Sequence, residues 1–172
     1  MRNLESRPGA PATTTVTLLP VSAEAGAAMA ANQPPPGVRV APDYPTEFSA
    51  GVGQQASAGL DRALGPFFIH RTEDGVVVGE IGGAFTGPGQ VEIGYAIVTS
   101  CWGRGYATAA VRSFVERARA VPGVARFVGH TPLDRPASGR VLEKAGFRVA
   151  AEIDDEHEGV PIRVVEWELT PS

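Results

Sequence analysis

Hydrophobic and polar residues alternate along three consecutive stretches in the middle of the chain, residues 67–71, 76–85 and 91–98. A period of two places successive side chains on opposite faces of a sheet, so each stretch predicts a strand. Turn residues separate the stretches: Asp74-Gly75 follows the first, and Gly-Pro-Gly at residues 87–89 follows the second. Because short turns join antiparallel neighbours, the pattern predicts an antiparallel meander of three strands.

The hydrophobic period lengthens after residue 105 and becomes typical of a helix. The apolar residues that share one side of this helix are Ala107, Ala110, Val111, Phe114 and Ala118. Pro122-Gly123 ends the helix, and residues 124–131 are again typical of a strand. A strand, a helix and a strand in this order form a right-handed crossover, so the strands at 91–98 and 124–131 are predicted to be parallel.

The N-terminal part is less regular. Residues 1–12 are predicted to be a loose tail, residues 13–19 a strand, and residues 23–31 a helix whose first amides are capped by the Ser22 hydroxyl. Residues 48–64 contain three glycines, which weaken a helix. Residues 38–64 as a whole are either a mobile wall or lid over a site or, as we favour, a surface loop with a short helix.

The C-terminal part predicts a short helix over residues 136–145 and a hairpin of strands 147–153 and 162–170 around the acidic turn 154–159. The element order is therefore β-α-α-β-β-β-α-β-α-β-β. No internal repeat interrupts it, so residues 13–170 are predicted to form one domain.

Composition narrows the function classes. The net charge of −4 comes without a dense basic run, which argues against a nucleic-acid partner. No apolar run approaches the roughly 20 residues that cross a bilayer, so no membrane partner is expected. The lone Cys101 cannot form an internal disulfide, which favours a cytoplasmic protein. Three widely separated histidines give no metal-ligand spacing.

The junction between the third meander strand and the following helix carries the clearest chemical signal. Gly103 and Gly105 bracket Arg104 there, and Ala107 follows, so few side chains shield the backbone amides. Such a turn at the positive end of a helix suits a phosphate or pyrophosphate. The alternative is a tight strand-to-helix turn whose glycines serve geometry alone.

Together with the element order, the segments WGRGYATAAV at residues 102–111 and ASGRVLEKAGF at residues 137–147 resemble the GNAT N-acetyltransferase superfamily, and within it the RimJ/RimL-type branch. The resemblance covers roughly residues 13–170. It implies an α/β (α+β) fold: a mixed, mostly antiparallel, V-shaped sheet of seven strands flanked by about four helices.

The resemblance also implies acetyl-CoA as cosubstrate. Trp102, Gly105 and Ala107 fall on the positions of the family's acetyl-CoA signature, although Trp102 departs from its usual Gln or Arg. The pyrophosphate is expected on the turn, the pantetheine arm along strand residues 95–98, and the oxyanion on an amide of Ile97 or Val98. The residues implied in cofactor binding are Ile97, Val98, Trp102, Gly103, Arg104, Gly105, Tyr106, Ala107 and Thr108.

The implied reaction is direct, sequential transfer of the acetyl group to a primary amine, on a protein N-terminus or on a small molecule. A competing possibility is a non-catalytic acetyl-CoA-binding or sensor module. A nucleotide-binding domain unrelated to CoA is disfavoured because no acidic ribose-binding residue follows the glycines at the expected distance. The acceptor amine stays open, and a homodimer is the assembly common among similar proteins.

The acceptor amine must lose a proton before it attacks, so a general base is needed. Glu92, on the strand that the cofactor follows, is the first candidate, because many of these enzymes keep a carboxylate there. Glu80 on the neighbouring strand is the second candidate. His130 and His70 are the remaining candidates, and for His130 a structural or orienting role is favoured.

The departing sulfur needs a proton or a hydrogen bond, and many family members use a tyrosine for it. This chain has none in the helix at 136–145, and Ser138 stands where the RimL-like branch places a serine. The alternative for Ser138 is a hydrogen bond within its own helix turn. Arg135 replaces an expected Asn, so Asp134 is expected to cap the helix in its place, or Arg135 to pair with a cofactor phosphate.

Overall fold

The computed structural model describes residues 13–58 and 62–172, so the predicted tail at residues 1–12 lies outside the described residues. The strands are β1 (Val16–Pro20), β2 (Phe67–Arg71), β3 (Val77–Gly87), β4 (Gln90–Ile97), β5 (Arg126–Pro132), β6 (Arg148–His157) and β7 (Val160–Leu169). The helices are α1 (Ala23–Ala30), α2 (Ser49–Ser57), α3 (Tyr106–Ala118) and α4 (Pro136–Lys144), with 3-10 turns at Arg62–Leu64 and Thr99–Cys101. This order is the predicted one.

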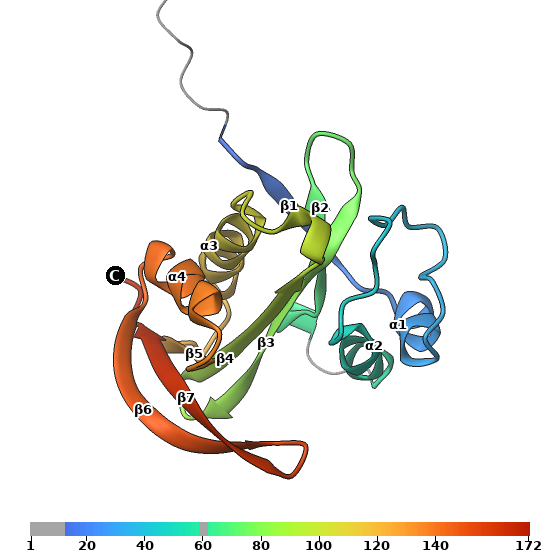
Figure 1. Cartoon of the computed structure of the whole chain (residues 1–172). Helices are drawn as coiled ribbons and strands as arrows, with labels where there is room; N and C mark the ends of the chain where they lie inside the picture. Colours follow the sequence, from blue (N-terminus) through green and yellow to red (C-terminus); the bar gives the residue numbers. More distant parts are fainter. Residues whose placement is uncertain (1–12, 59–61) are drawn as a thin grey trace, which may run out of the picture.

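One seven-stranded sheet forms the centre of the molecule, in the order β1-β2-β3-β4-β5-β7-β6. Neighbouring strands are antiparallel except β4 and β5, which are parallel as the crossover through α3 predicts. Helices α3 and α4 lie on one side of the sheet and α1 and α2 on the other, while β6 and β7 curve away as a long hairpin (Figure 1).

Alternation along β2 supplies both faces of the sheet with core residues. Phe67 packs edge-on against Phe114 of α3, with ring centroids 6.3 Å apart. The next residue, Phe68, belongs instead to the cluster that packs α1 and α2 on the opposite face. Because successive side chains of a strand point to opposite faces, one Phe-Phe pair anchors both helical layers.

Helix α1 begins where the sequence predicted. The Ser22 hydroxyl accepts a hydrogen bond from the Ala25 amide at 3.0 Å, which satisfies one of the free amides of the first turn.

Helix α2 forms in the region where glycines weaken the sequence signal. Gly53 lies against α1: a Cβ there would sit 2.5 Å from the Gly26 carbonyl oxygen and 2.6 Å from the Ala30 nitrogen. Close backbone approach between the two helices therefore explains this glycine. The predicted short helix is present, as Ser49–Ser57.

The closing hairpin differs from the prediction in its turn. Asp154, Asp155 and Glu156 lie inside β6, and the turn is only Glu158-Gly159. The predicted acidic turn at 154–159 is therefore wrong. The two strands continue past residue 153, and their last pair is His157 with Val160. Ion pairs join them there, because Arg163 on β7 lies 3.3 Å from Glu152 and 3.6 Å from Asp154 on β6.

Among the helices of the described ranges, none is long and apolar enough to cross a membrane.

The contact between α1 and α2 yields a stability prediction. Gly53→Ala should lower the free energy of unfolding by about 1–3 kcal/mol, since the new methyl group overlaps the backbone of α1. Urea denaturation measures this loss.

Gly51→Ala in the same helix is the control. A Cβ there meets open space, so this variant should gain roughly 0.5–1 kcal/mol from helix propensity. Equal effects of the two substitutions would contradict the close packing.

Candidate active site

The parallel ladder between β4 and β5 is short. It pairs Gln90 with Arg126, Val91 with Phe127 and Glu92 with Val128, and no pair of these two strands follows. Beyond it, β4 continues to Ile97 beside β3, while β5 continues to Pro132 beside β7. The two strands therefore diverge in a V, as the family resemblance implied.

The amides of the two candidate oxyanion donors face different ways. The Val98 amide donates to the Val78 carbonyl at 2.8 Å, so it is already used within the sheet. Antiparallel hydrogen bonds alternate along a strand, which turns the Ile97 backbone away from β3 and toward the V. This corrects the prediction for Val98 as an oxyanion donor and leaves Ile97.

Trp102 lies over the open end of β4. Its indole N–H donates to the Ile97 carbonyl at 2.7 Å, and the residue is 66% exposed. Trp102 therefore does not pack in the core beneath the turn. Its position beside the Ile97 backbone agrees with a place along the cofactor path.

The turn before α3 has the backbone conformation that an anion cradle needs. Gly103 and Gly105 have φ angles of +71° and +82°, in the left-handed region that favours glycine. No side chain caps α3, so its first amides have no partner within the helix. Thr14 supports the turn from β1's side by donating to the Arg104 carbonyl at 2.8 Å. The residues present therefore fit a pyrophosphate.

The residues predicted to bind the cofactor at this turn differ in exposure. Gly103, Arg104 and Gly105 are exposed, and Ala107 and Thr108 are half-buried at the start of α3. Tyr106, by contrast, is buried in the core, so only its backbone amide faces the cradle.

On the face opposite α3, a cavity of about 450 Å³ lies between the sheet, α2 and the start of α4. Its floor consists of small residues at cross-strand positions of β3 and β4, where Gly82 pairs with Gly94. Ala84 and Ala96 extend this floor toward its two ends. The cavity exists because these four positions carry almost no side chain.

One end of the cavity holds the first-choice base. Glu92 pairs with Ala84, and its Oε1 lies 3.0 Å from Nδ1 of His130. The other ring nitrogen, Nε2, lies 3.1 Å from Oε2 of Glu166 on β7. Both nitrogens of His130 are thus occupied by carboxylates, which agrees with an orienting role for His130.

The surroundings of His130 shift its pKa. Burial alone would lower its pKa, but the hydrogen bonds and negative charges of Glu92 and Glu166 outweigh burial and raise it.

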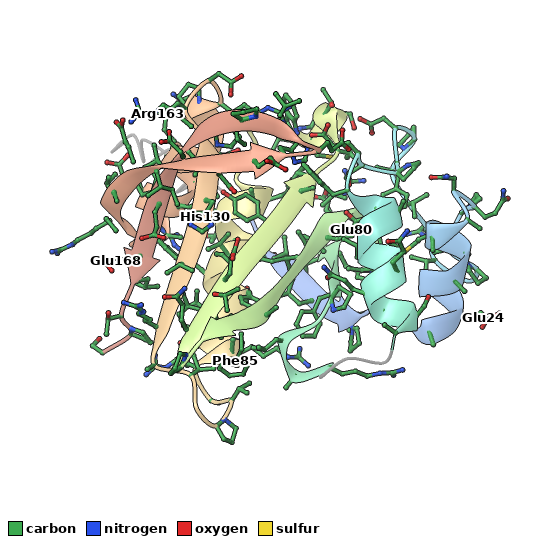
Figure 2. All side chains as sticks on the ribbon, turned by 90° about the horizontal axis from the view of Figure 1, so that it is seen from below. Glu24, Glu80, Phe85, His130, Arg163 and Glu168 are labelled. Carbon is green, nitrogen blue, oxygen red and sulfur yellow. The ribbon has the colours of Figure 1, made fainter. Side chains whose placement is uncertain are left out.

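The opposite end of the cavity holds Glu80, which pairs with Ala96 and is 1% exposed. Its carboxylate accepts hydrogen bonds from the hydroxyls of Tyr44 (2.5 Å), Thr46 (3.1 Å) and Ser49. Burial raises the pKa of Glu80, and the three hydroxyl donors only partly oppose the shift. Figure 2 shows Glu80 next to α2 and His130 toward β5 and β7, with β4 running between them.

This network gives Glu80 a structural task. Its three partners come from residues 44–49, so the buried carboxylate fixes the segment that leads into α2 and walls the cavity. The spacing between Glu80 and Glu92 along the sheet is four residues, or about 13 Å.

Ser138 lines the cavity from the first turn of α4. Its carbonyl accepts a hydrogen bond from the Tyr95 hydroxyl at 3.0 Å, which ties α4 to the open part of β4. Burial raises the pKa of Tyr95, so the phenol stays a donor.

The unusual Arg135 also lines this cavity. It forms an ion pair with Glu47 at 3.0 Å, from the segment before α2, rather than reaching the phosphate cradle. Helix α4 has no side-chain cap, so the substitute cap expected from Asp134 is wrong.

The last candidate base lies away from the cavity: His70 is on β2, where its Nδ1 lies 3.0 Å from the Gly75 carbonyl oxygen. The lone cysteine, Cys101, is 4% exposed in the core. In the described part of the chain, no group of three or more His, Cys, Asp or Glu residues is arranged to hold a metal ion.

Sequence reasoning missed Glu166 and the three hydroxyl partners of Glu80. Glu166 is the direct cross-strand neighbour of His130, a pairing that needs the register of β5 and β7. Alternation within one strand gives no register, so no local signal pointed to it.

Comparison with known proteins decides the family. The model of the acetyltransferase (GNAT) domain matches residues 16–148, more than half of the chain. The chain belongs to this family. As a GNAT protein it is an acetyl-CoA-dependent N-acetyltransferase, and acetyl-CoA is its cosubstrate. Among curated proteins, none matches the sequence.

Solved structures share the GNAT fold at low identity. RimJ of Mycobacterium smegmatis, in complex with CoA-disulfide, is 22% identical, with a TM-score of 0.64 over 90% of this chain and 81% of that one. The microcin C7 self-immunity acetyltransferase MccE, in complex with acetyl-CoA and AMP, is 14% identical, with a TM-score of 0.67 over 91% and 93%. A GNAT-family protein from Bordetella pertussis is 24% identical, with a TM-score of 0.61 over 90% and 96%.

The cradle before α3 gives a binding prediction. Gly105→Glu should lower CoA affinity at least tenfold, because it adds a negative charge to the turn on which the pyrophosphate is expected and would repel it. Isothermal titration calorimetry with CoA measures the change.

Gly123→Glu is the matched control. Gly123 also has a positive φ, +88°, and a Cβ there would meet open space beyond the other end of α3. Both variants should lose about 1–2 kcal/mol of stability to backbone strain, but only the first should lose CoA binding. Equal affinities would contradict the cradle.

The buried Glu80 gives a pH prediction. Its folded-state pKa is raised, so its contribution to stability is complete below the pKa of the unfolded chain and is lost as the pH rises through the folded pKa. Relative to the wild type, Glu80→Gln should therefore become more stable as the pH rises from 4 to 8. Urea unfolding of the two proteins over this pH range measures the slope.

Proposed function

We propose that this GNAT protein transfers the acetyl group directly to a primary amine that binds in the cavity over β3 and β4. The cavity is the observation that carries the proposal. It is open above Gly82 and Gly94, and its lining includes Glu92, Ser138 and the strand that diverges from β5.

The charge of the cavity suits the acceptor. A primary amine is an ammonium ion at neutral pH, and Glu92 at one end of the cavity can both attract the cation and accept its proton. The Oε1 atom of Glu92 is held by His130, so Oε2 is left for the amine or for a bridging water. This division of labour supports Glu92, rather than His130, as the general base.

The remaining groups match the other needs of acyl transfer. The Ile97 amide faces the V and suits the oxyanion that forms on the acetyl carbonyl. The Ser138 hydroxyl, near the start of α4, suits a hydrogen bond to the departing sulfur. Burial of Cys101 disfavours an acetyl-cysteine intermediate and so supports a sequential reaction.

We place the protein in the RimJ/RimL-type branch, with a protein N-terminus or a small-molecule amine as acceptor. The similarity to RimJ and the sequence segments at 102–111 and 137–147 support this assignment. The net charge of −4 supports an acceptor that is neither nucleic acid nor membrane lipid. The homodimer and the cytoplasmic location remain predictions.

Turnover tests the proposal. With acetyl-CoA and a panel of N-terminal peptides, polyamines and aminoglycosides, at least one amine should release free thiol well above hydrolysis. Glu92→Gln should lower kcat roughly 100-fold, since it removes the base, and Ser138→Ala roughly tenfold, since a hydrogen bond to sulfur is lost.

A thermal shift by acetyl-CoA accompanies the assay. If acetyl-CoA raises the melting temperature but no amine gives thiol release, the protein is the binding or sensor module and the proposed transfer is wrong. Full activity of Glu92→Gln would sink the base assignment alone.

A further inference from the structure

Three side chains on three neighbouring strands form a continuous contact across the base of the V. Glu92 of β4 is the last residue of the parallel ladder, and His130 of β5 lies two positions beyond the end of that ladder. Glu166 of β7 pairs directly with His130 in the antiparallel ladder. The contacts of 3.0 Å and 3.1 Å join them in the order Glu92, His130, Glu166.

The two ends of this contact differ in what they face. Glu92 and His130 line the acceptor cavity, whereas Glu166 does not. The β6 residue that pairs with Glu166 is the small, uncharged Ala151. Glu166 contacts His130 but does not line the cavity, so its path to the acceptor runs through His130.

Hydrogen-bond chemistry fixes the state of the imidazole. An ionised carboxylate only accepts hydrogen bonds, so a ring that lies between two carboxylates satisfies both when both of its nitrogens donate. This is the imidazolium form. Its Nδ1–H holds Oε1 of Glu92, and its Nε2–H is held by Oε2 of Glu166.

The rest of the surroundings leaves this arrangement undisturbed. Arg135 of α4 lines the same cavity but pairs with Glu47. Glu80 of β3 is at the other end of the cavity and is bonded to hydroxyls. Ser138 of α4 is neutral. In the described part of the chain, Glu92 and Glu166 are the charged partners of His130.

We infer that Glu166 is a positioning residue for acetyl transfer: by holding His130 from behind, it keeps the Glu92 carboxylate oriented with one oxygen toward the acceptor amine. The inference rests on the proposed function, in which Glu92 is the base. In the step concerned, an N–H bond of the ammonium breaks and its proton moves to Oε2 of Glu92. The electron pair stays on nitrogen and attacks the acetyl carbonyl.

Without Glu166, the imidazole would lose its proton more easily. Neutral His130 has a single N–H: on Nδ1 it would hold Glu92 only by an uncharged, weaker hydrogen bond, and on Nε2 it would present a lone pair to the Glu92 carboxylate. In both tautomers the hold on the orientation of Glu92 weakens. The loss should depend on pH, because it follows the titration of His130.

The test compares Glu166→Gln with Glu168→Gln in the full chain, using acetyl-CoA and the best amine of the panel. The amide introduced by Glu166→Gln keeps an oxygen that accepts from Nε2–H but removes the charge. Glu168 is on the same strand and face, where it pairs with Val128 and Arg148 rather than with His130. It is therefore a matched control for charge.

We expect Glu166→Gln to show near-wild-type kcat at pH 6 and about tenfold lower kcat at pH 8, with an unchanged KM for acetyl-CoA. The Glu168→Gln profile should overlie the wild type. A second readout is the NMR titration of the His130 imidazole, assigned with His130→Gln. Its midpoint should fall in Glu166→Gln and in Glu92→Gln, and stay in Glu168→Gln.

The outcomes separate the two proposals. A kcat loss of equal size at every pH would mean that Glu166 only stabilises the fold, and it would overturn the inference, as would an unshifted His130 titration. With either of these two results, the proposed function still stands as long as the wild type acetylates an amine. If the wild type turns over no amine, the proposed function fails, and the positioning role fails with it.

Discussion

The divergence of β4 from β5 is the constraint on which the site depends. Parallel strands normally pair along their length, but here pairing stops after Glu92 and Val128. Each strand then finds a partner on its other side, β3 for β4 and β7 for β5, so the sheet stays continuous although its middle opens. The opening exposes one edge of β4, with the Ile97 amide, at a place where backbone groups would otherwise be used up.

The cavity depends on a second constraint, the absence of side-chain volume. Gly82, Ala84, Gly94 and Ala96 share one face, and on the other face of the same strands Ile81 and Ile93 are buried against α3. The same alternation thus builds a dense core and an open site back to back. Glu80 and Glu92 stand at opposite ends of the open face, and their environments differ: one carboxylate is enclosed by hydroxyls, the other is shared with an imidazole.

The sequence predicted the element order, the parallel crossover and the Ser22 cap, because these features follow from local periodicity and turn chemistry. It also singled out Glu92, which lies on β4 and lines the cavity. It did not reveal the role of Glu166 or of Tyr44, Thr46 and Ser49, since each contact joins residues more than 30 positions apart. The predicted acidic turn at 154–159 is wrong for a related reason. Local polarity favours a turn, but residues 154–157 pair with β7 and therefore form part of a strand.

The indole of Trp102 adds an energetic consequence for cofactor affinity. The Ile97 carbonyl already has a donor, the Nε1–H of this residue. A carbonyl oxygen has two lone pairs, so a pantetheine amide that pairs with Ile97 would share this acceptor with the indole or displace it, and would gain less there than at a free carbonyl. The phosphates, predicted to lie on the Gly103–Gly105 turn, would then supply more of the affinity. The protein can thereby hold its cosubstrate firmly at one end and still release the arm easily after the acetyl group has gone.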